Sequence, residues 1–309
     1  MTHRAIAFRP RSTAIASLLL AALVVVALRG APTAASEQRR TAMVRAVEKV
    51  RPSVVNLRGN KTLRSEEGPV GASGREVNGM GTGIVLDERG YIITNNHVVE
   101  GVRQIDVTLA DGSTLRGVVV ASDPKTDLAI IKISAPQKLP VVTIGTSSDL
   151  MVAEPVIAVG NAYGYEHTVT RGVVSALHRS VQVSDTQSYT DLIQTDASIN
   201  PGNSGGPLLN IDGELIGINV AVRAGAQGIG FAIPVDQVMQ VAAELLSIEN
   251  VDQNWHGIAV KSGPKGLVVD KLLAESPAAK SELKAGDVLK SVAGQPVTRP
   301  LDVERGFLG

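Results

Sequence analysis

The feature that most constrains the fold is a run of short, β-branched segments between residues 80 and 234. Segments such as GTGIVLD, GYIITN, LAIIKI and GELIGINVAV are separated by turn signals, among them DERG at 87–90 and the pair Asp111-Gly112. β-branched residues favour strands, and Asp-Gly pairs are typical of hairpin turns. Many strands at close spacing, with almost no helix between them, predict antiparallel barrels or a sandwich.

One stretch near the end of this region has helical periodicity. Residues 234–248 (PVDQVMQVAAELLSI) place six apolar side chains on one helix face. These are Val235, Val238, Met239, Ala242, Leu245 and Leu246. We expect this helix to close the β-rich domain, with a boundary at about 249–255. Ahead of the strands, the sequence predicts a charged helical lead-in, a strand at SVVNL and a polar loop over 59–79.

Residues 256–309 have the pattern of a second, small unit. Strand-like runs alternate with the turn LKAGD and the hairpin-like VAGQPV. The unit contains 54 residues (256–309) and stops at a glycine without a closing strand. That is short for an independent domain, so the sequence indicates a fragment of one.

The first 36 residues resemble a targeting segment. A positive n-region with three arginines precedes an uncharged h-region of 16 residues (13–28), and RGAPTAAS offers a cleavage site before Ser36. The h-region is shorter than the roughly 20 residues of a membrane span, which favours a cleaved signal peptide over an uncleaved anchor. Both interpretations export the domain, so we expect a periplasmic or exported protein, attached to the inner membrane only if the segment is retained.

Charge and cysteine content exclude several classes of partner. Thirty basic and thirty acidic residues cancel, so nothing favours a nucleic-acid partner. The chain has no cysteine and therefore no disulfide, although an exported location would permit one. Because no histidine pair sits at metal-ligand spacing either, we expect no metal and no other cofactor.

Three polar residues stand at the edges of apolar strands. His97 follows GYIITNN, Asp127 precedes LAIIKI, and Ser204 lies in NPGNSGGPLLN. Taken singly, each has a plainer interpretation as a turn, structural or solvated residue. Together they have the chemistry of base, orienter and nucleophile. Gly202, Asn203 and Ser204 form the candidate oxyanion loop, in which the N–H groups of Gly202 and Ser204 would bind the oxyanion.

TNNHVV, TDLAIIKI and GNSGGPL, in that order, resemble the trypsin-fold serine proteases of the HtrA/Deg type. GNAYGYEHTVTRGVVSAL and GIGFAIP are similar to further segments of that family, and the resemblance covers about residues 42–309. It implies a mainly β protein with two six-stranded Greek-key barrels, followed by a partial PDZ domain with a peptide groove. We expect a signal peptide or anchor at 1–36, a protease domain at 37–250 and the partial PDZ domain at 251–309.

The resemblance also implies a specificity pocket. Its residues are Ser198, Ile199, Ile229 and Phe231, none of them acidic. Such a pocket should accept Val, Ala or Leu and reject Lys and Arg for want of a counter-charge. Asn203 stands where digestive relatives carry an Asp that pairs with a newly cleaved N-terminus. We therefore predict activity that needs no propeptide cleavage.

The sequence thus predicts an exported serine endopeptidase that degrades unfolded or misfolded proteins in envelope quality control, through an acyl-enzyme intermediate. The alternative is a non-catalytic envelope chaperone or adaptor that binds exposed peptide segments. An esterase is disfavoured because the chain order is His-Asp-Ser, not the Ser-Asp-His of α/β-hydrolases.

The expected partners are unfolded polypeptides and C-terminal peptides, the latter bound by strand addition if the PDZ groove is complete. By resemblance, aromatic residues also imply a homotrimer. Tyr163 and Tyr165 fit the loop that such a contact uses, whereas residues 37–60 contain no aromatic.

Overall fold

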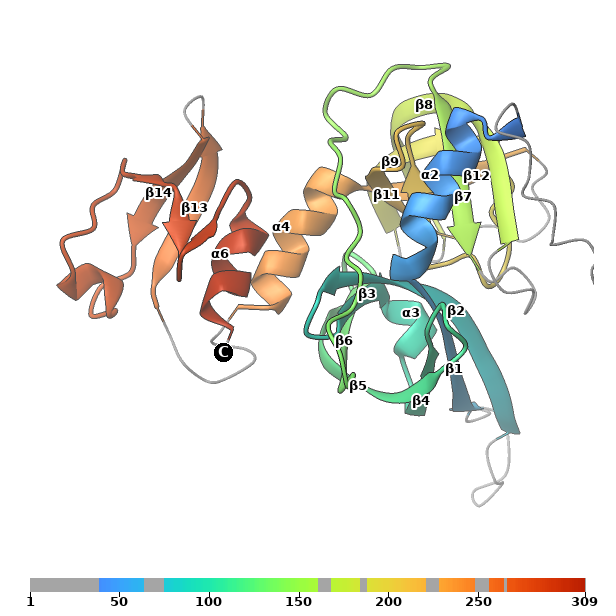
Figure 1. Ribbon diagram of the computed structural model, residues 1–309, viewed down its shortest axis with the longest axis horizontal. Coiled ribbons are helices and arrows are strands. Elements are labelled where there is room, and N and C mark those ends of the chain that lie inside the picture. The colour runs from blue at the N-terminus through green and yellow to red at the C-terminus, as the bar shows by residue number, and fades with distance from the viewer. Residues whose placement is uncertain are drawn as a thin grey trace, which may run out of the picture. The chain divides into compact units, whose positions relative to one another are not determined.

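The structure is a computed structural model. It describes residues 39–63, 75–160, 168–183, 188–220, 228–247, 256–263 and 266–308. The chain divides into two units, Met1–Thr41 and Ala42–Gly309, and the elements described below belong to the second (Figure 1). The predicted signal peptide or anchor at 1–36 lies outside the described residues. Within those residues, no helix combines the length and apolar character needed to cross a membrane.

A helical lead-in precedes the strands, as the sequence predicted. Helix α2 (Ala42–Val50) continues into the 3-10 turn η2 (Arg51–Ser53), which has proline in its first turn. Ala46 is 2% exposed and packs against Gly213, where a Cβ would lie only 3.0 Å from the Ala46 Cα. The lead-in therefore packs with close backbone contact on the turn that contains Gly213.

The first six strands form a closed barrel. Their bounds are β1 (Val54–Leu63), β2 (Arg75–Asp87), β3 (Tyr91–Asn95), β4 (Val102–Thr108), β5 (Thr114–Asp123) and β6 (Leu128–Ile133). They pair antiparallel in the order β1-β2-β3-β6-β5-β4. Valine, isoleucine and leucine fill the interior, as expected of strands with one buried face in a chain poor in aromatics.

The polar loop predicted over 59–79 is wrong at both of its ends. Strands β1 and β2 remain paired as far as Leu63 and Arg75, and Gly59 is paired with Gly79. Strand pairing joins backbone N–H and C=O groups, so a polar sequence does not prevent it. The hydrophilic composition of this stretch therefore gave no indication that the β1–β2 hairpin continues into it.

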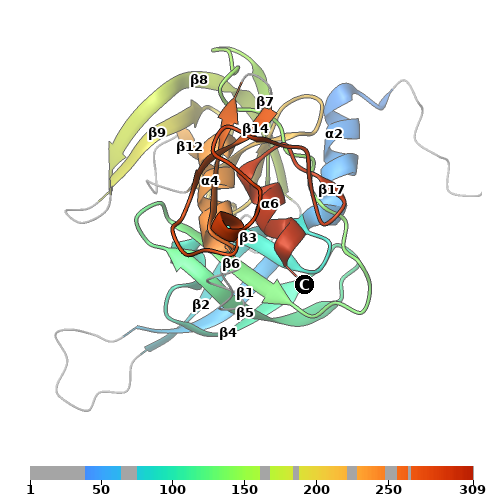
Figure 2. The ribbon, with the colours of Figure 1, turned by 90° about the vertical axis from the view of Figure 1, so that its left-hand side faces the viewer.

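The next six strands form a second closed barrel. Their bounds are β7 (Pro155–Gly160), β8 (Thr168–Gln182), β9 (Ser188–Thr195), β10 (Pro207–Leu209), β11 (Leu215–Val220) and β12 (Gly230–Pro234). They pair antiparallel in the order β10-β11-β12-β9-β8-β7. Figure 2 shows the β1–β6 barrel below and the strands of the second barrel above it. The prediction of two six-stranded barrels is confirmed.

Helix α4 (Val235–Leu245) follows the second barrel directly and confirms the predicted helix. It contacts β5 and β6 of the first barrel and β11 and β12 of the second. Its buried face joins a continuous apolar cluster that includes residues of both barrels, such as Ile93 and Ile218. Two strand modules are thereby held together by aliphatic packing rather than by disulfides.

The C-terminal region forms two small sheets and a helix. Its elements are β13 (Ile258–Gly263), β14 (Gly266–Leu272), η4 (Ala278–Lys280), β15 (Val288–Leu289), β16 (Ser291–Val292), β17 (Gln295–Pro296) and α6 (Pro300–Phe307). Leu267, Val292, Val297 and Val303 form its own core. Helix α6 also contacts α4, and Arg305 Nε lies 2.8 Å from Asp87 Oδ2 of the first barrel.

Candidate active site

His97 is carried by a one-turn helix at the end of strand β3. This helix, α3 (Asn96–Val99), begins where the backbone N–H of Asn96 donates to the Asp127 carbonyl oxygen at 3.0 Å. The side-chain amide of Asn95 donates to the same oxygen, also at 3.0 Å. The loop that contains Asp127 thus organises the turn that presents His97.

The Asp127 carboxylate holds His97 by two hydrogen bonds. The His97 backbone N–H donates to Oδ1 at 2.8 Å, and Nδ1 of the ring lies 2.7 Å from Oδ2. Asp127 is 3% exposed and has a φ of +59°, a left-handed conformation that costs energy for most residues. A carboxylate on Nδ1 selects the tautomer in which Nε2 is free of a proton and can act as a base.

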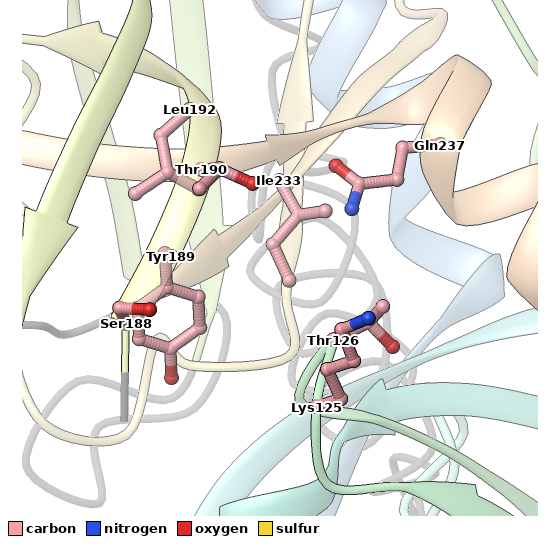
Figure 3. Close-up of a pocket in the computed structure, with 8 residues that line it drawn as sticks. All are labelled: Lys125, Thr126, Ser188, Tyr189, Thr190, Leu192, Ile233 and Gln237. Atoms are coloured by element: carbon pink, nitrogen blue, oxygen red, sulfur yellow. The ribbon is translucent and has the colours of Figure 1, made fainter. Parts of the chain in front are cut away.

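A third donor to the carboxylate comes from the other barrel. The Tyr189 hydroxyl on β9 donates to Asp127 Oδ2 at 2.9 Å, and Tyr189 is 9% exposed. Figure 3 shows Tyr189 and Leu192 on one side of a pocket, with Lys125 and Thr126 on the other. Sequence reasoning missed Tyr189. The only indication in the sequence is an aromatic residue at a buried position of strand β9. Such a residue does not reveal a polar contact to the other barrel.

The loop with Ser204 is docked on the first barrel. The Thr82 N–H donates to the Ser204 carbonyl oxygen at 2.9 Å, and the Thr82 hydroxyl donates to the Gly202 carbonyl oxygen at 2.7 Å. At Gly205, with φ +81°, a Cβ would lie 2.2 Å from both the Thr82 carbonyl oxygen and the Thr94 hydroxyl. Glycine is therefore required for this approach, which brings the serine loop to the end of the strand that leads into the His97 turn.

Residues 200–203 form a turn with a defined direction. The Asn203 N–H donates to the Asn200 carbonyl oxygen at 2.9 Å, and Gly202 has φ +101°. Proline at the second position and a positive-φ glycine at the third are the signature of a type II turn. The Asn203 N–H is therefore used for the hydrogen bond inside the turn. The direction of the Gly202 N–H is set by the type of the turn.

The Asn203 side chain is fully buried behind the serine loop. Its Nδ2 lies 3.4 Å from the Ser198 carbonyl oxygen, and a Cβ on Gly160 would lie 2.6 Å from its Oδ1. Among the described residues, Oδ1 has no hydrogen-bond partner. A neutral amide tolerates this site far better than a carboxylate would, because a buried charge without a partner is costly.

Of the four predicted pocket residues, Ser198 contacts the serine loop through its carbonyl oxygen, and the other three have different surroundings. Ile199 packs in the interior of the second barrel, and a Cβ on Gly230 would lie 2.6 Å from its Cγ1. Ile229, which directly precedes Gly230 in the chain, is 48% exposed. Phe231 instead packs against the cluster between the barrels, since it points to the opposite face of β12 from Ala232.

Two comparisons with known protein families match this arrangement. The family described as "Trypsin-like peptidase domain" matches residues 81–218, and the family described as "PDZ domain" matches residues 245–300. A Synechocystis protein described as the serine protease HhoB is 39% identical, over 88% of this chain and 74% of its own length. This chain belongs to the HtrA-type serine proteases.

Other relatives of this HtrA-type protease agree. A Halomonas elongata protein described as a DegP-like periplasmic serine endoprotease is 37% identical over 81% of the chain and 62% of its own length. The solved structure titled "HtrA-type protease AlgW with decapeptide" is 34% identical with a TM-score of 0.56, and the match covers 84% of this chain and 87% of that one. The chain spans about half the length of several Pseudomonas relatives that it matches.

Two predictions about this HtrA-type protease are not tested by the structure. Tyr163 and Tyr165, which fit a trimer contact, lie outside the described residues. In the part of the chain that the structure describes, His, Asp and Glu side chains do not gather in a group of three that could hold a metal. His178 and Asp191 meet at 2.5 Å, and that pair is exposed on the bulged β8–β9 ribbon.

Proposed function

We propose that this protein is an exported, periplasmic serine endopeptidase in which Ser204 is the nucleophile, His97 the base and Asp127 the orienter. The observation that carries the proposal is the pair of hydrogen bonds from His97 to Asp127, at 2.8 and 2.7 Å, beside a serine loop docked on the same barrel. One relative described as a serine protease and another described as a periplasmic serine endoprotease support the activity and the location.

The chemistry proceeds through an acyl-enzyme. His97 Nε2 takes the proton from Ser204 Oγ as the oxygen attacks the scissile carbonyl carbon, and the carboxylate of Asp127 stabilises the imidazolium that forms. The N–H groups of Gly202 and Ser204 stabilise the oxyanion, because Asn203 already uses its N–H inside the turn. The imidazolium then protonates the leaving amine, and water repeats the sequence to release the acid.

The substrate is extended, unfolded polypeptide. The proposed pocket residues Ser198, Ile199, Ile229 and Phe231 include no acidic side chain. It therefore favours Val, Ala or Leu before the scissile bond and rejects Lys and Arg. The buried amide of Asn203 needs no new N-terminus as a counter-charge, so the chain is active without propeptide cleavage.

The C-terminal region serves peptide recognition. The edge of strand β13 and helix α6 bind a C-terminal peptide by strand addition, which is the role of a PDZ domain. The AlgW structures, whose titles name a decapeptide and a tripeptide, support a peptide ligand. Degradation of misfolded envelope proteins, as a homotrimer, is the cellular role that we infer.

Casein degradation tests the catalytic assignment. Ser204→Ala should abolish turnover while the protein retains its circular dichroism spectrum and its binding of unfolded casein. Ser113→Ala, in an exposed turn of the first barrel, serves as the matched control and should cleave at the wild-type rate. Undiminished cleavage by Ser204→Ala would refute the assignment, and casein binding without turnover by the wild type would favour the chaperone or adaptor.

A further inference from the structure

His256 folds back onto the first amide of the edge strand β13. The Ile258 N–H donates to His256 Nδ1 at 3.0 Å, so this nitrogen is an acceptor and carries no proton. The Ile258 amide begins the strand to which a peptide would add. In the described structure β13 pairs only with β14, which leaves its other edge open toward helix α6 (Figure 1).

The other side of the imidazole is held by helix α6. His256 Nε2 lies 3.2 Å from both carboxylate oxygens of Glu304, and the two side chains are only 15% and 11% exposed. The ring stacks on Phe307 with 4.7 Å between centroids and 16° between planes. The neutral ring, with its proton on Nε2, satisfies both contacts. Protonation of Nδ1 would place two N–H groups face to face and break the contact to Ile258.

The backbone around this contact is shaped to bind an anion. Gly257 has φ +72°, and a Cβ there would lie 2.1 Å from the Ser276 Cβ, so glycine is required. Successive N–H groups beside a left-handed residue converge on a concavity that takes up anions, including the carboxylate of a chain terminus. A peptide added antiparallel to β13 ends at this concavity. One N–H donor of this concavity, that of Ile258, is already bound to His256 Nδ1.

We propose that His256 is a built-in competitor for the peptide carboxylate, so that C-terminal peptides bind this groove more tightly once His256 is protonated. Above the titration range of histidine, the carboxylate must displace Nδ1 from Ile258. Within pH 5 to 8 an imidazole takes up a proton, after which it no longer accepts from Ile258 and its charge attracts the carboxylate. The inference rests on the peptide-binding role proposed above.

Few other charges face this ring among the described residues. From α6 the facing titratable group is Glu304, 3.2 Å from Nε2. The 3-10 helix η4 contributes the Ala278 N–H, which donates to the His256 carbonyl oxygen at 3.1 Å, and its Lys280 is exposed. On β13 itself, Lys261 is paired with Asp270 at 2.5 Å.

Peptide binding at two pH values tests the proposal on the full chain. The probe is a fluorescein-labelled pool of decapeptides with four randomised final positions, made as the free acid and as the carboxamide, with Ser204→Ala as the non-cleaving background. We expect the free-acid pool to bind about three- to tenfold more tightly at pH 5.5 than at pH 8, the worth of one modest hydrogen bond. The carboxamide pool should show no such gain.

Two variants separate the roles of the ring. His256→Phe keeps an aromatic stack on Phe307 but removes the acceptor, so it should bind the free acid tightly at pH 8 and lose the pH dependence. Glu304→Gln can still accept from Nε2 but does not stabilise the imidazolium, so it should shift the gain in affinity to lower pH. Circular dichroism establishes that both variants are folded.

The outcomes distinguish this inference from the function on which it rests. Peptide binding that is equally tight in wild type and His256→Phe, with the same pH dependence, overturns the role of His256 and leaves the groove intact. Failure of every variant to bind either pool at both pH values overturns the groove as well. Without any peptide, the Ile258 amide resonance should shift as His256 titrates, and an unchanged resonance also overturns the inference.

Discussion

The hydroxyl of Tyr189 donates to Asp127 Oδ2 at 2.9 Å, so the second barrel helps to hold the carboxylate that orients His97 on the first. This bond reaches between the two barrels, which are joined elsewhere by an aliphatic cluster. The same carboxylate oxygen accepts from the imidazole at 2.7 Å. The geometry of the His97–Asp127 pair therefore depends on how the two barrels are docked, as well as on the local turn at Asp127.

Tyr189→Phe should slow catalysis without affecting substrate affinity. The variant keeps the ring in place and removes one donor to a buried carboxylate, which is worth about 1.5 kcal/mol or more. We expect kcat/KM for a fluorogenic apolar peptide to fall about tenfold, with the loss in kcat. Thr190→Ala, in the same pocket, is the control and should retain wild-type rates. An unchanged kcat in Tyr189→Phe would show that Asp127 does not need this donor.

Gly202→Ala should impair the oxyanion site. The φ of +101° belongs to the left-handed region, and a Cβ there favours a flip of the turn that redirects the Gly202 N–H. We expect a fall in kcat of about 100-fold or more, the usual result of losing one oxyanion donor. Gly112→Ala is the matched control, since Gly112 also has positive φ (+85°) but lies in a turn of the first barrel with open space around it. Equal losses in the two variants would assign the effect to backbone strain alone.

Acid should weaken the fold through Asp87. Burial raises the pKa of this carboxyl, but hydrogen bonds from Arg89 and Arg305 outweigh burial and hold the pKa well below its ordinary value. The unfolded chain therefore takes up this proton first, at about pH 4, and the contribution of Asp87 is complete above that pH and lost as pH falls further. The free energy of unfolding in urea should decline more steeply from pH 5 to 3 in wild type than in Asp87→Asn.

Asp87→Asn should also lower the stability at pH 7, by about 1–3 kcal/mol. The two arginines are partly exposed, at 32% and 27%, so water compensates for some of the lost pairing. Parallel pH profiles in wild type and variant would mean that Asp87 is not linked to acid unfolding.

Ala153→Gly should stabilise the protein. Ala153 has φ +74° in an exposed turn before β7, and its N–H donates to the Val174 carbonyl oxygen at 2.8 Å. The left-handed conformation costs alanine about 1–2 kcal/mol, more than the added entropy cost of glycine. We expect a gain of about 0.5–1 kcal/mol in urea unfolding. Ala121→Gly, in strand β5, should lose a similar amount, and a loss in both variants would contradict the argument.

Sequence reasoning was strongest where a backbone pattern and a polar residue coincide. β-branched runs with turn residues predicted antiparallel barrels or a sandwich, because side-chain alternation and turn chemistry act over a few residues. The resemblance of the motifs narrowed this to two barrels. His97, Asp127 and Ser204 were predicted as catalytic residues from their places at strand edges. The structure adds that Asp127 reaches His97 at 2.7 Å.

Other features depend on contacts between segments far apart in the chain. Tyr189 escaped notice because its partner lies 62 residues away and on the other barrel. The polar loop predicted over 59–79 was wrong at its ends because pairing across a hairpin is a property of two backbones. The contact of His256 with Glu304, 48 residues further on, likewise requires the tertiary fold.

Position 127 must satisfy two separate requirements, a left-handed backbone and a negative charge. A φ of +59° raises the free energy of the folded state for most residues, but Asp and Asn adopt that region with little penalty. Asn would therefore preserve the conformation while removing the negative charge, and Ala would forfeit both. Few single replacements can separate architecture from electrostatics in this way. Evolution away from proteolysis at this position would leave a stable, inert scaffold by way of Asn and a weakened one by way of Ala.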